Sequence, residues 1–405
     1  MRCGLLGRKL GHSYSPMLHA LLGDYEYLLY EREPEQVGDF LLHGDWDALN
    51  VTIPYKKTVV PYMSELSEAA AALQSVNTIL RRADGSLYGD NTDVYGFSYM
   101  LRRSGARPDG KKALVLGSGG ASVTVCQVLR QLGAQVVVVS RSGEDNYENL
   151  SRHRDARLIV NATPVGMYPQ NGSAPLSLRG FPACECVLDL IYNPDRTALL
   201  LEAEELGIPH ANGLSMLAAQ AKRGSELFTG HTLDDGEIER AISALQRSLQ
   251  NIVLIGMPGC GKSTVARRLS EALNRPVYET DRMIEERAGM SIPKIFETQG
   301  EDAFRALETE VLRDVGKLSG AILSTGGGCV TRAENYAPLH QNGRIVWLRR
   351  PLAALPTEGR PLSQKHSPEQ LYEARRALYE RFADVQVEND RAVEETVRKV
   401  LEVIS

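Results

Sequence analysis

Short runs of consecutive apolar residues recur through the middle of the chain, and segments with helical periodicity separate them. The runs occupy Lys112–Leu116, Gln135–Val139, Arg157–Val160 and Cys186–Leu190. Helical patterns lie between and after them, for example at Val123–Leu132 and Leu199–Leu206. Strands that are apolar throughout are buried on both faces, and their alternation with helices is typical of a parallel sheet covered by helices. The pattern predicts a doubly wound α/β domain.

A second α/β segment is predicted further along the chain. The apolar run Ile252–Ile255 leads into a glycine-rich loop, and Val265, Leu269 and Leu273 then share one face of a helical pattern. Residues 236–249 form an amphipathic helix that reaches this strand without a linker rich in Gly, Ser or Pro. The sequence therefore predicts two α/β segments joined through a helix.

Size and composition limit the classes of protein to be considered. A chain of 405 residues, 43% hydrophobic and 24% charged, is long enough for two or three ordinary globular domains. A net charge of −5 argues against nucleic acid as the main partner, and no apolar run reaches the length of a membrane span. The start of the chain lacks a signal-peptide pattern, and the six cysteines form no C-x-x-C pair. We expect a cytoplasmic protein with reduced thiols, and the sequence does not specify its oligomeric state.

The glycine-rich loop of the second segment is a complete G-x-x-x-x-G-K-S motif. In this motif, backbone N–H groups cradle phosphates, the lysine reaches the β and γ oxygens, and the serine hydroxyl holds Mg²⁺. The sequence therefore predicts a site for a nucleotide such as ATP with Mg²⁺. The residues expected to hold it are Gly256, Gly259, Cys260, Gly261, Lys262, Ser263 and Thr264.

A different glycine motif follows the first strand of the doubly wound segment. It consists of Gly117, Gly119, Gly120 and Ala121 within a G-x-G-G-A-S sequence, which departs from the strict dinucleotide pattern G-x-G-x-x-G. An ordinary glycine turn is the alternative. Either reading places the loop between a strand and a helix.

Residues after the second strand bear on the choice of dinucleotide. Ser140 and Arg141 stand where NADP-binding proteins place an arginine, which can pair with the 2′-phosphate through two hydrogen bonds. Glu144 and Asp145 would oppose such binding if they faced inward. A solvated Arg141 without a ligand is the other possibility.

Polar motifs before and after this segment suit a small polyhydroxylated carboxylate. Hydroxyls, amides, one lysine and one aspartate occur in SYSP (13–16), NVTIPYKK (50–57), VNT (76–78), GDNTD (89–93) and NGLSML (212–217), with Gln220 beyond. Taken singly, each has an ordinary explanation: Ser15-Pro16 as a helix start, Asp93 as a helix cap and Lys56 as a surface lysine. Only their combination points to a binding site.

Together these motifs resemble shikimate dehydrogenase over about residues 1–249. GHSYSP, NVTIPYK, VNT, GDNTD, GSGGAS, VNATPVGM, DLIYNP and NGLSMLAAQ occur in the family's order. Enzymes of this family reduce 3-dehydroshikimate to shikimate with NADPH. The resemblance implies that Lys56 and Asp93 form the catalytic pair, in which an ammonium beside a carboxylate relays a proton and stabilises an alkoxide.

The same resemblance implies the binding residues. Substrate would be held by Ser13, Ser15, Thr52, Asn77, Asp93, Tyr192 and Gln220. The nicotinamide and ribose pocket would be lined by Ala162, Thr163, Met167 and Gly213. The family usually has Asn-Arg-Thr where this chain has Ser140-Arg141-Ser142, and a second basic residue nearby is absent. We therefore expect a preference for NADP that is weaker than usual.

The second segment carries candidates for a phosphoryl acceptor site. Acidic, basic and glycine residues follow the loop in the order ETD (279–281), GEDAFRALE (300–308), STGGG (324–328), Arg360 and Arg375. A carboxylate able to act as a base and two arginines able to clamp a carboxylate suit a small acid with a free hydroxyl. The transfer itself depends mostly on positioning and charge neutralisation.

This order resembles shikimate kinase over about residues 250–405. The resemblance implies that Asp281 is the base, that Arg305 and Arg375 bind the shikimate carboxylate, and that Gly327 and Gly328 approach its ring hydroxyls. Lys262 and Ser263 would serve ATP and Mg²⁺. Glu279 replaces the family's first aspartate and remains able to reach Mg²⁺ through water. Arg360 would lie in a lid that is short and lacks an early arginine.

The two resemblances suggest a domain division and a leading hypothesis. Residues 1–100 would bind shikimate, completed by helix 236–249; residues 101–235 would form a Rossmann-like NADP domain. Residues 250–405 would form a P-loop kinase domain with an acceptor part at about 281–310 and a lid at about 351–363. The hypothesis is a bifunctional enzyme that makes shikimate and then phosphorylates it. The alternatives are an active dehydrogenase with a kinase half that only binds or docks, and a first half that accepts quinate and NAD.

Overall fold

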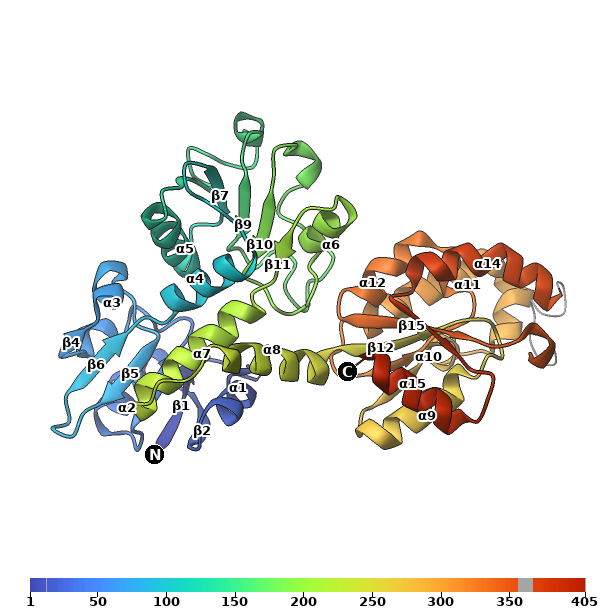
Figure 1. The fold of residues 1–405 in the computed structure, drawn as a ribbon, viewed down its shortest axis with the longest axis horizontal. Coiled ribbons are helices and arrows are strands. Elements are labelled where there is room, and N and C mark those ends of the chain that lie inside the picture. Colours follow the sequence, from blue (N-terminus) through green and yellow to red (C-terminus); the bar gives the residue numbers. More distant parts are fainter. Residues whose placement is uncertain (12, 356–366, 405) are drawn as a thin grey trace. The chain divides into compact units, whose positions relative to one another are not determined.

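The computed structural model describes residues 1–11, 13–355 and 367–404, which form two compact units (Figure 1). The first unit comprises Met1–Val165, Ala174–Tyr192 and Glu202–Leu245, and the second Gly166–Ser173, Asn193–Leu201 and Gln246–Ser405. The predicted α/β class with parallel sheets is confirmed. The division into two units assigns two loops of the predicted NADP domain to the second unit and crosses the helix at 236–249. The three-domain division therefore stays a prediction.

The first sheet of the first unit is mixed. Its order is β2-β1-β3-β5-β6-β4. The strands are β1 (Arg2–Gly7), β2 (Glu26–Glu31), β3 (Ala48–Val51), β4 (Glu65–Leu66), β5 (Thr78–Arg81) and β6 (Leu87–Asp90). β1 is parallel to β3, whereas β5 is antiparallel to both β3 and β6 and pairs Thr78 with Asn50 and Asp90. The start of β5 therefore lies beside the ends of β3 and β6, which brings three of the polar motifs to one edge.

Helices of this part are α1 (Ser15–Leu22), α2 (Val37–His43) and α3 (Glu68–Leu73). Across both units, short 3₁₀ turns lie at Pro34–Gln36, Val60–Tyr62, Leu150–His153, Leu178–Gly180, Cys329–Thr331, Ala333–Asn335 and Leu352–Ala354.

The second sheet of the first unit is parallel and matches the apolar runs of the sequence. Its order is β11-β10-β9-β7-β8. The strands are β7 (Lys112–Leu116), β8 (Gln135–Val139), β9 (Leu158–Asn161), β10 (Cys186–Asp189) and β11 (His210–Ala211). The helices are α4 (Asp93–Arg103), α5 (Gly120–Gln131), α6 (Ala198–Glu205) and α7 (Leu214–Thr229). The strand order reverses beside β7, so the crevice beyond the carboxyl ends of β7 and β9 is the expected ligand position.

Helices α4, α7 and α8 (Gly236–Leu249) pack together within the first unit. A Cβ atom at Gly96 of α4 would lie 2.6 Å from the Met216 carbonyl oxygen of α7, so only glycine permits this approach. Glu239 of α8 accepts hydrogen bonds from Tyr99 and Arg103 of α4. The amino-terminal part of α8 is thus fixed to the first unit.

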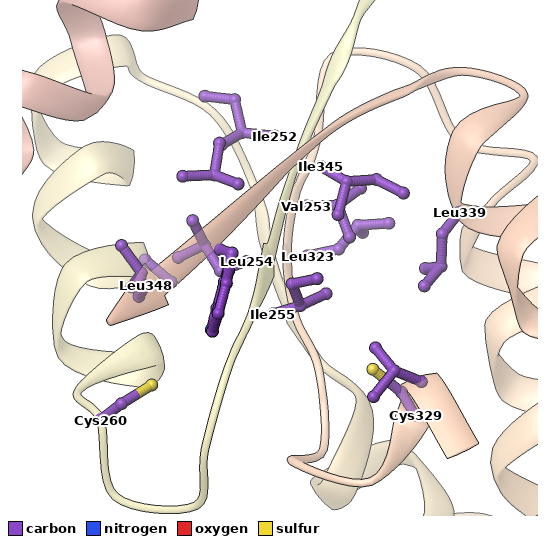
Figure 2. Close-up of a cluster of buried hydrophobic side chains, with 14 of the residues drawn as sticks. Ile252, Val253, Leu254, Ile255, Cys260, Leu323, Cys329, Leu339, Ile345 and Leu348 are labelled. Carbon is purple, nitrogen blue, oxygen red and sulfur yellow. The ribbon is translucent and has the colours of Figure 1, made fainter. Parts of the chain in front are cut away.

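The sheet of the second unit is parallel, with the order β13-β14-β12-β15-β16. The strands are β12 (Asn251–Ile255), β13 (Val277–Glu279), β14 (Ile322–Ser324), β15 (Gly343–Arg349) and β16 (Val385–Glu388). The helices are α9 (Lys262–Leu273), α10 (Thr280–Ala288), α11 (Ile292–Val315), α12 (Tyr336–His340), α14 (Pro368–Phe382) and α15 (Val393–Ile404). Figure 2 shows Ile252–Ile255 of β12 among side chains of its neighbours β14 and β15, and all four are buried. This core holds the strand from which the phosphate-binding loop starts.

Among the described residues, none of the helices has the length and apolar character that crossing a membrane requires.

Candidate active sites

Lys56 and Asp93 form an ion pair in the first unit. Lys56 Nζ donates to Asp93 Oδ2 at 2.5 Å, and the exposed fractions of the two side chains are 29% and 8%. Asp93 begins α4, where the helix dipole favours a carboxylate. Its other oxygen accepts a hydrogen bond from Asn77 Nδ2 at 2.9 Å. Both carboxylate oxygens are therefore oriented, and the lysine ammonium remains partly open to solvent.

The remaining predicted substrate residues of the same unit lie after strands, at or just before the start of α1, or on α7. Ser13 follows β1 and donates through Oγ to Ser15 Oγ at 3.1 Å. Thr52 follows β3, and its N–H donates to the Leu6 carbonyl oxygen of the parallel neighbour β1. Tyr192 follows β10, and its ring centroid lies 5.4 Å from that of Tyr14. Gln220 lies on α7 (Leu214–Thr229), and its Cβ contacts the position of Gly96.

The glycine motif forms a turn between β7 and α5. Gly117 has a φ of +101°, and a Cβ atom there would lie 2.9 Å from Thr163 Cγ2. Side chains at Gly119 or Gly120 would meet nothing within 4 Å, so the amino end of α5 is open to a ligand. Ala162 and Thr163 follow β9, the neighbouring strand. Together these residues can hold a pyrophosphate at a helix N-terminus.

Two other predicted cofactor residues differ in their surroundings. A Cβ atom at Gly213 would lie 2.0 Å from the Leu190 carbonyl oxygen, so only glycine fits at this position. Met167 belongs to the Gly166–Ser173 segment of the second unit and is 45% exposed. Its role in a nicotinamide pocket stays a prediction.

The loop after β8 leaves Arg141 exposed and turns one of the nearby acids away. Asp145 Oδ1 pairs with His153 Nε2 at 2.7 Å. The Ser140 N–H donates to the Asp145 carbonyl oxygen, which closes the loop. Glu144 remains exposed. Of the two acidic residues expected to oppose NADP binding, Asp145 is therefore already paired with a residue of the protein.

The phosphate-binding loop of the second unit depends on three glycines with positive φ: Gly256 (+143°), Gly259 (+81°) and Gly261 (+99°). At Gly256 a Cβ atom would lie 2.4 Å from the Leu348 carbonyl oxygen of β15, so the loop starts tightly against the sheet. Lys262 begins α9, and its Nζ donates to the carbonyl oxygens of Gly256 and Met257 at 2.9 and 3.0 Å. The ammonium therefore lies over the loop.

A cavity of about 550 Å³ opens in front of this loop. It brings together residues that the sequence assigned separately to nucleotide and to acceptor. From the prediction it is lined by Gly259, Gly261, Lys262, Ser263, Thr264, Glu279, Asp281, Arg305, Gly327, Gly328 and Arg375. Cys260 belongs to the loop, and its side chain is buried; Figure 2 shows it next to the start of α9. Arg360 and most of the predicted lid lie outside the described residues.

Two carboxylates lie close to each other on this cavity. Asp281 lies in the first turn of α10, and its side chain is open to the cavity. The surrounding protein still desolvates its carboxylate, which raises its pKa. The positive charges of Lys262 and Arg305 oppose that rise. Glu308 is fully buried, and burial raises its pKa as well. A Cβ atom at Gly326 would lie 2.7 Å from Asp281 Oδ1 and 2.8 Å from Glu308 Oε1, so the glycine turn passes between the carboxylates.

The two predicted carboxylate-binding arginines both lie against the glycine turn. Arg305 Nη1 donates to Glu308 Oε2 at 2.7 Å, and a Cβ atom at Gly328 would lie 2.3 Å from both Nη atoms. Arg375 Nη1 donates to the Gly327 carbonyl oxygen at 3.2 Å. Backbone and guanidinium groups therefore approach each other where a side chain would separate them.

Several residues that shape this site carry no assigned role in the sequence prediction. Glu308 follows Arg305 by three residues and Tyr379 follows Arg375 by four, a helical spacing that can be seen in the sequence. Tyr379 donates its hydroxyl hydrogen to the Gly327 carbonyl oxygen. Asn389, after β16, donates through Nδ2 to the Cys260 carbonyl oxygen at 2.6 Å. No local motif marks Asn389, because its partner is distant in sequence.

The residues predicted to bind Mg²⁺ fit that ion through its usual ligands. Within the described part of the chain, no three His, Cys, Asp or Glu side chains gather as a metal site. Mg²⁺ in nucleotide sites commonly takes one or two protein oxygens and completes its shell with phosphates and water. The Ser263 hydroxyl and the Glu279 carboxylate line the same cavity and supply such oxygens.

Comparisons with known proteins match two separate parts of the chain. The family model described as shikimate dehydrogenase substrate binding domain matches residues 5–79, and the shikimate kinase model matches residues 258–405. The shikimate dehydrogenase (NADP(+)) of Clostridium perfringens strain SM101 is 33% identical over 265 residues, which cover 60% of this chain and 97% of that protein. The Syntrophomonas wolfei enzyme of the same name is 36% identical and covers 56% and 89%.

Solved structures of dehydrogenases are also similar to this chain over about 60% of its length. A chorismate mutase/shikimate 5-dehydrogenase fusion protein from Clostridium acetobutylicum is 34% identical, with a TM-score of 0.57 over 60% of this chain and 96% of that one. A quinate dehydrogenase from Corynebacterium glutamicum in complex with NAD is 26% identical, with a TM-score of 0.55 over 60% and 98%. The chain thus belongs to the shikimate dehydrogenase family and carries a shikimate kinase domain after that part.

Proposed function

We propose that the chain catalyses two consecutive reactions: reduction of 3-dehydroshikimate to shikimate with NADPH, and phosphorylation of shikimate to shikimate 3-phosphate with ATP and Mg²⁺. The observation that carries the proposal is the cavity in which a phosphate-binding loop, a carboxylate and two arginines meet. The kinase half then consumes the product of the dehydrogenase half.

In the first reaction, Lys56 is the proton donor and Asp93 orients it. NADPH, when bound, supplies a hydride to the carbonyl carbon of 3-dehydroshikimate. The Lys56 ammonium lies on the open side of the pair, so it can stabilise the negative charge that develops on the carbonyl oxygen and give it a proton. Ser13, Ser15, Thr52 and Asn77 bind the carboxylate and hydroxyls, together with Tyr192 and Gln220.

In the second reaction, Asp281 accepts the proton of the substrate hydroxyl as that oxygen forms its bond to phosphorus. Desolvation raises the pKa of Asp281, which makes it a stronger base than an ordinary aspartate. Arg305 and Arg375 hold the carboxylate of shikimate, and Lys262 neutralises phosphate charge. ATP supplies the phosphoryl group, and Ser263 and Glu279 would hold Mg²⁺, which would neutralise charge on the phosphates. Arg360 is assigned to a lid that adds further positive charge.

Cofactor choice provides one prediction. Arg141→Ala is expected to lower the ratio of kcat/KM with NADPH to kcat/KM with NADH by about 10- to 100-fold, because a bidentate, charge-assisted contact to the 2′-phosphate is lost. Steady-state kinetics with both cofactors measures the ratio. Arg154→Ala is the matched control, because Arg154 is also exposed and lies beyond the Asp145–His153 pair. An unchanged ratio in Arg141→Ala rejects an NADP site built on this residue and favours the NAD alternative.

The glycine turn at 326–328 of the kinase half provides another prediction. Gly328→Ala is expected to raise KM for shikimate by at least about 10-fold, because the new methyl group would displace the Arg305 guanidinium, whose contacts to charged groups are each worth ~1.5–3 kcal/mol. Initial rates at saturating ATP measure it. Gly289→Ala is the control for an added methyl group without a clash: nothing lies near the Cβ position of Gly289, although its φ is positive and that of Gly328 is not. Equal KM values in the two variants would contradict the assignment of Arg305.

A coupled assay tests the proposal as a whole. Purified protein is supplied with 3-dehydroshikimate, NADPH, ATP and Mg²⁺, and products are identified by mass. Shikimate 3-phosphate is the expected final product. Accumulation of shikimate alone indicates that the kinase half only binds or docks, and turnover of quinate with NAD in a parallel reaction indicates the other alternative.

A further inference from the structure

We propose that Thr78 is a positioning residue of the dehydrogenase site: its hydroxyl fixes the amide of Asn77, which in turn orients the Asp93 carboxylate. This proposal rests on the catalytic pair assigned above and goes beyond it. The evidence is a chain of hydrogen bonds that starts at Tyr27 of β2, passes through residues of β3 and β5 and ends on the carboxylate. Thr78 itself is fully buried and does not contact the solvent of the site.

The chain begins at an aromatic cluster. Tyr27 stacks on His19 with ring centroids 4.0 Å apart and an interplanar angle of 9°. His19 stacks on Phe228 at 5.6 Å, and its Nδ1 pairs with the Tyr25 hydroxyl at 2.6 Å. Burial lowers the pKa of His19 to about 3, so this ring stays neutral at ordinary pH. Tyr27 is therefore held rigidly with its hydroxyl pointing at β3.

Each bond of the chain fixes the direction of the next. The Tyr27 hydroxyl donates to Asn50 Oδ1 at 2.7 Å, so the Asn50 amide nitrogen is left to face Thr78 and donates to its Oγ1 at 3.2 Å. Thr78 Oγ1 thus accepts on this side, and its single hydrogen points to Asn77 Oδ1 at 3.0 Å. The register of β3 and β5, which pairs Asn50 with Thr78, makes this possible.

The consequence for Asn77 is a defined amide orientation. Its Oδ1 accepts from Thr78 and from the Thr92 N–H at 2.8 Å, so its Nδ2 faces Asp93 Oδ1 at 2.9 Å. A flipped amide would set an oxygen against the carboxylate. Donor chains of this kind polarise one another in a buried setting, which strengthens the last bond to Asp93. Since Thr92 also supports Asn77, removal of Thr78 should weaken the arrangement without abolishing it.

The test compares Thr78→Val with Thr78→Ser in the full-length protein. Valine keeps the shape but cannot donate or accept, whereas serine keeps the hydroxyl. We expect kcat for shikimate oxidation to fall about 5- to 20-fold in Thr78→Val, in line with the loss of a hydrogen bond that supports a charged group. KM for NADP⁺ and the kinase rate of the same sample should be unchanged. Thr78→Ser should restore kcat to within about twofold, because it rebuilds the bond.

The controls separate positioning from a loss of structure. Thr58→Val, at an exposed threonine, reports any general effect of the substitution. If Thr78→Val fails to fold, Tyr27→Phe removes the first donor of the chain instead and should lower kcat in the same direction. An unchanged kcat in folded Thr78→Val, or a loss in Thr78→Ser equal to that in Thr78→Val, overturns the proposal. Inactivity of the unmodified chain toward shikimate would instead contradict the proposed function.

Discussion

Replacing Lys56 with alanine is expected to lower kcat for shikimate oxidation by about 10³-fold, within the range known for the loss of a general acid or base. The ammonium is the exposed member of a pair whose carboxylate is almost fully buried, so it alone can reach a carbonyl oxygen. KM for NADP⁺ should change little, because Lys56 lies in the turn after β3 and not on the β7–α5 loop. The rate of NADPH formation at saturating substrate measures the effect.

The second activity proposed for the chain provides a control for this variant. ATP-dependent phosphorylation of shikimate by the same preparation should proceed at the rate of the unmodified protein, which excludes a general folding defect. Lys57→Ala is the matched substitution, since Lys57 is adjacent and exposed. A Lys56→Ala protein that keeps more than a tenth of the dehydrogenase rate would exclude Lys56 as the proton donor.

How far the sequence predicts the fold depends on how strands are buried. The strands at Lys112–Leu116 and Gln135–Val139 occur where the apolar runs predict them, because helices cover both faces of a parallel sheet and favour apolar residues there. The first of them is buried from Ala113 to Leu116, whereas the second, at the edge of the sheet, is mostly half-buried. The first sheet gave no such signal. Its β3 and β5 have only four residues each, and β5 runs antiparallel between its neighbours. Pairing of this kind depends on distant segments and not on a local period.

The same distinction applies to the sites. Residues joined by helical spacing, such as Arg305 with Glu308, can be paired from the sequence. By contrast, Asp145 is turned toward His153, and the Thr78 hydroxyl reaches the Asp93 carboxylate through Asn77. These relations follow from loop closure and strand register, which composition and spacing do not express. The sequence can therefore propose which residues take part in the chemistry, but not which ones orient them.

Replacing Asp281 with asparagine is expected to lower kcat for shikimate phosphorylation by about 10²- to 10³-fold while dehydrogenase activity remains unchanged. Asparagine keeps the size of the side chain but cannot accept a proton from the substrate hydroxyl. Phosphorylation rates at saturating ATP and shikimate measure the effect. Asp302→Asn, at an exposed acid of the neighbouring helix α11, is the control.

The pH dependence of phosphorylation by the unmodified protein provides a second test of Asp281 as the base. Desolvation raises the pKa of Asp281, and only the deprotonated carboxylate accepts a proton, so the phosphorylation rate should fall with decreasing pH at a higher pH than an ordinary aspartate would allow. Glu308 also has a raised pKa, but it acts by holding Arg305, so its protonation should raise KM for shikimate. The acid-side fall in kcat should therefore disappear in Asp281→Asn, whereas any acid-side rise in KM should persist. A fall in kcat that survives the substitution would assign the base to another group on the cavity.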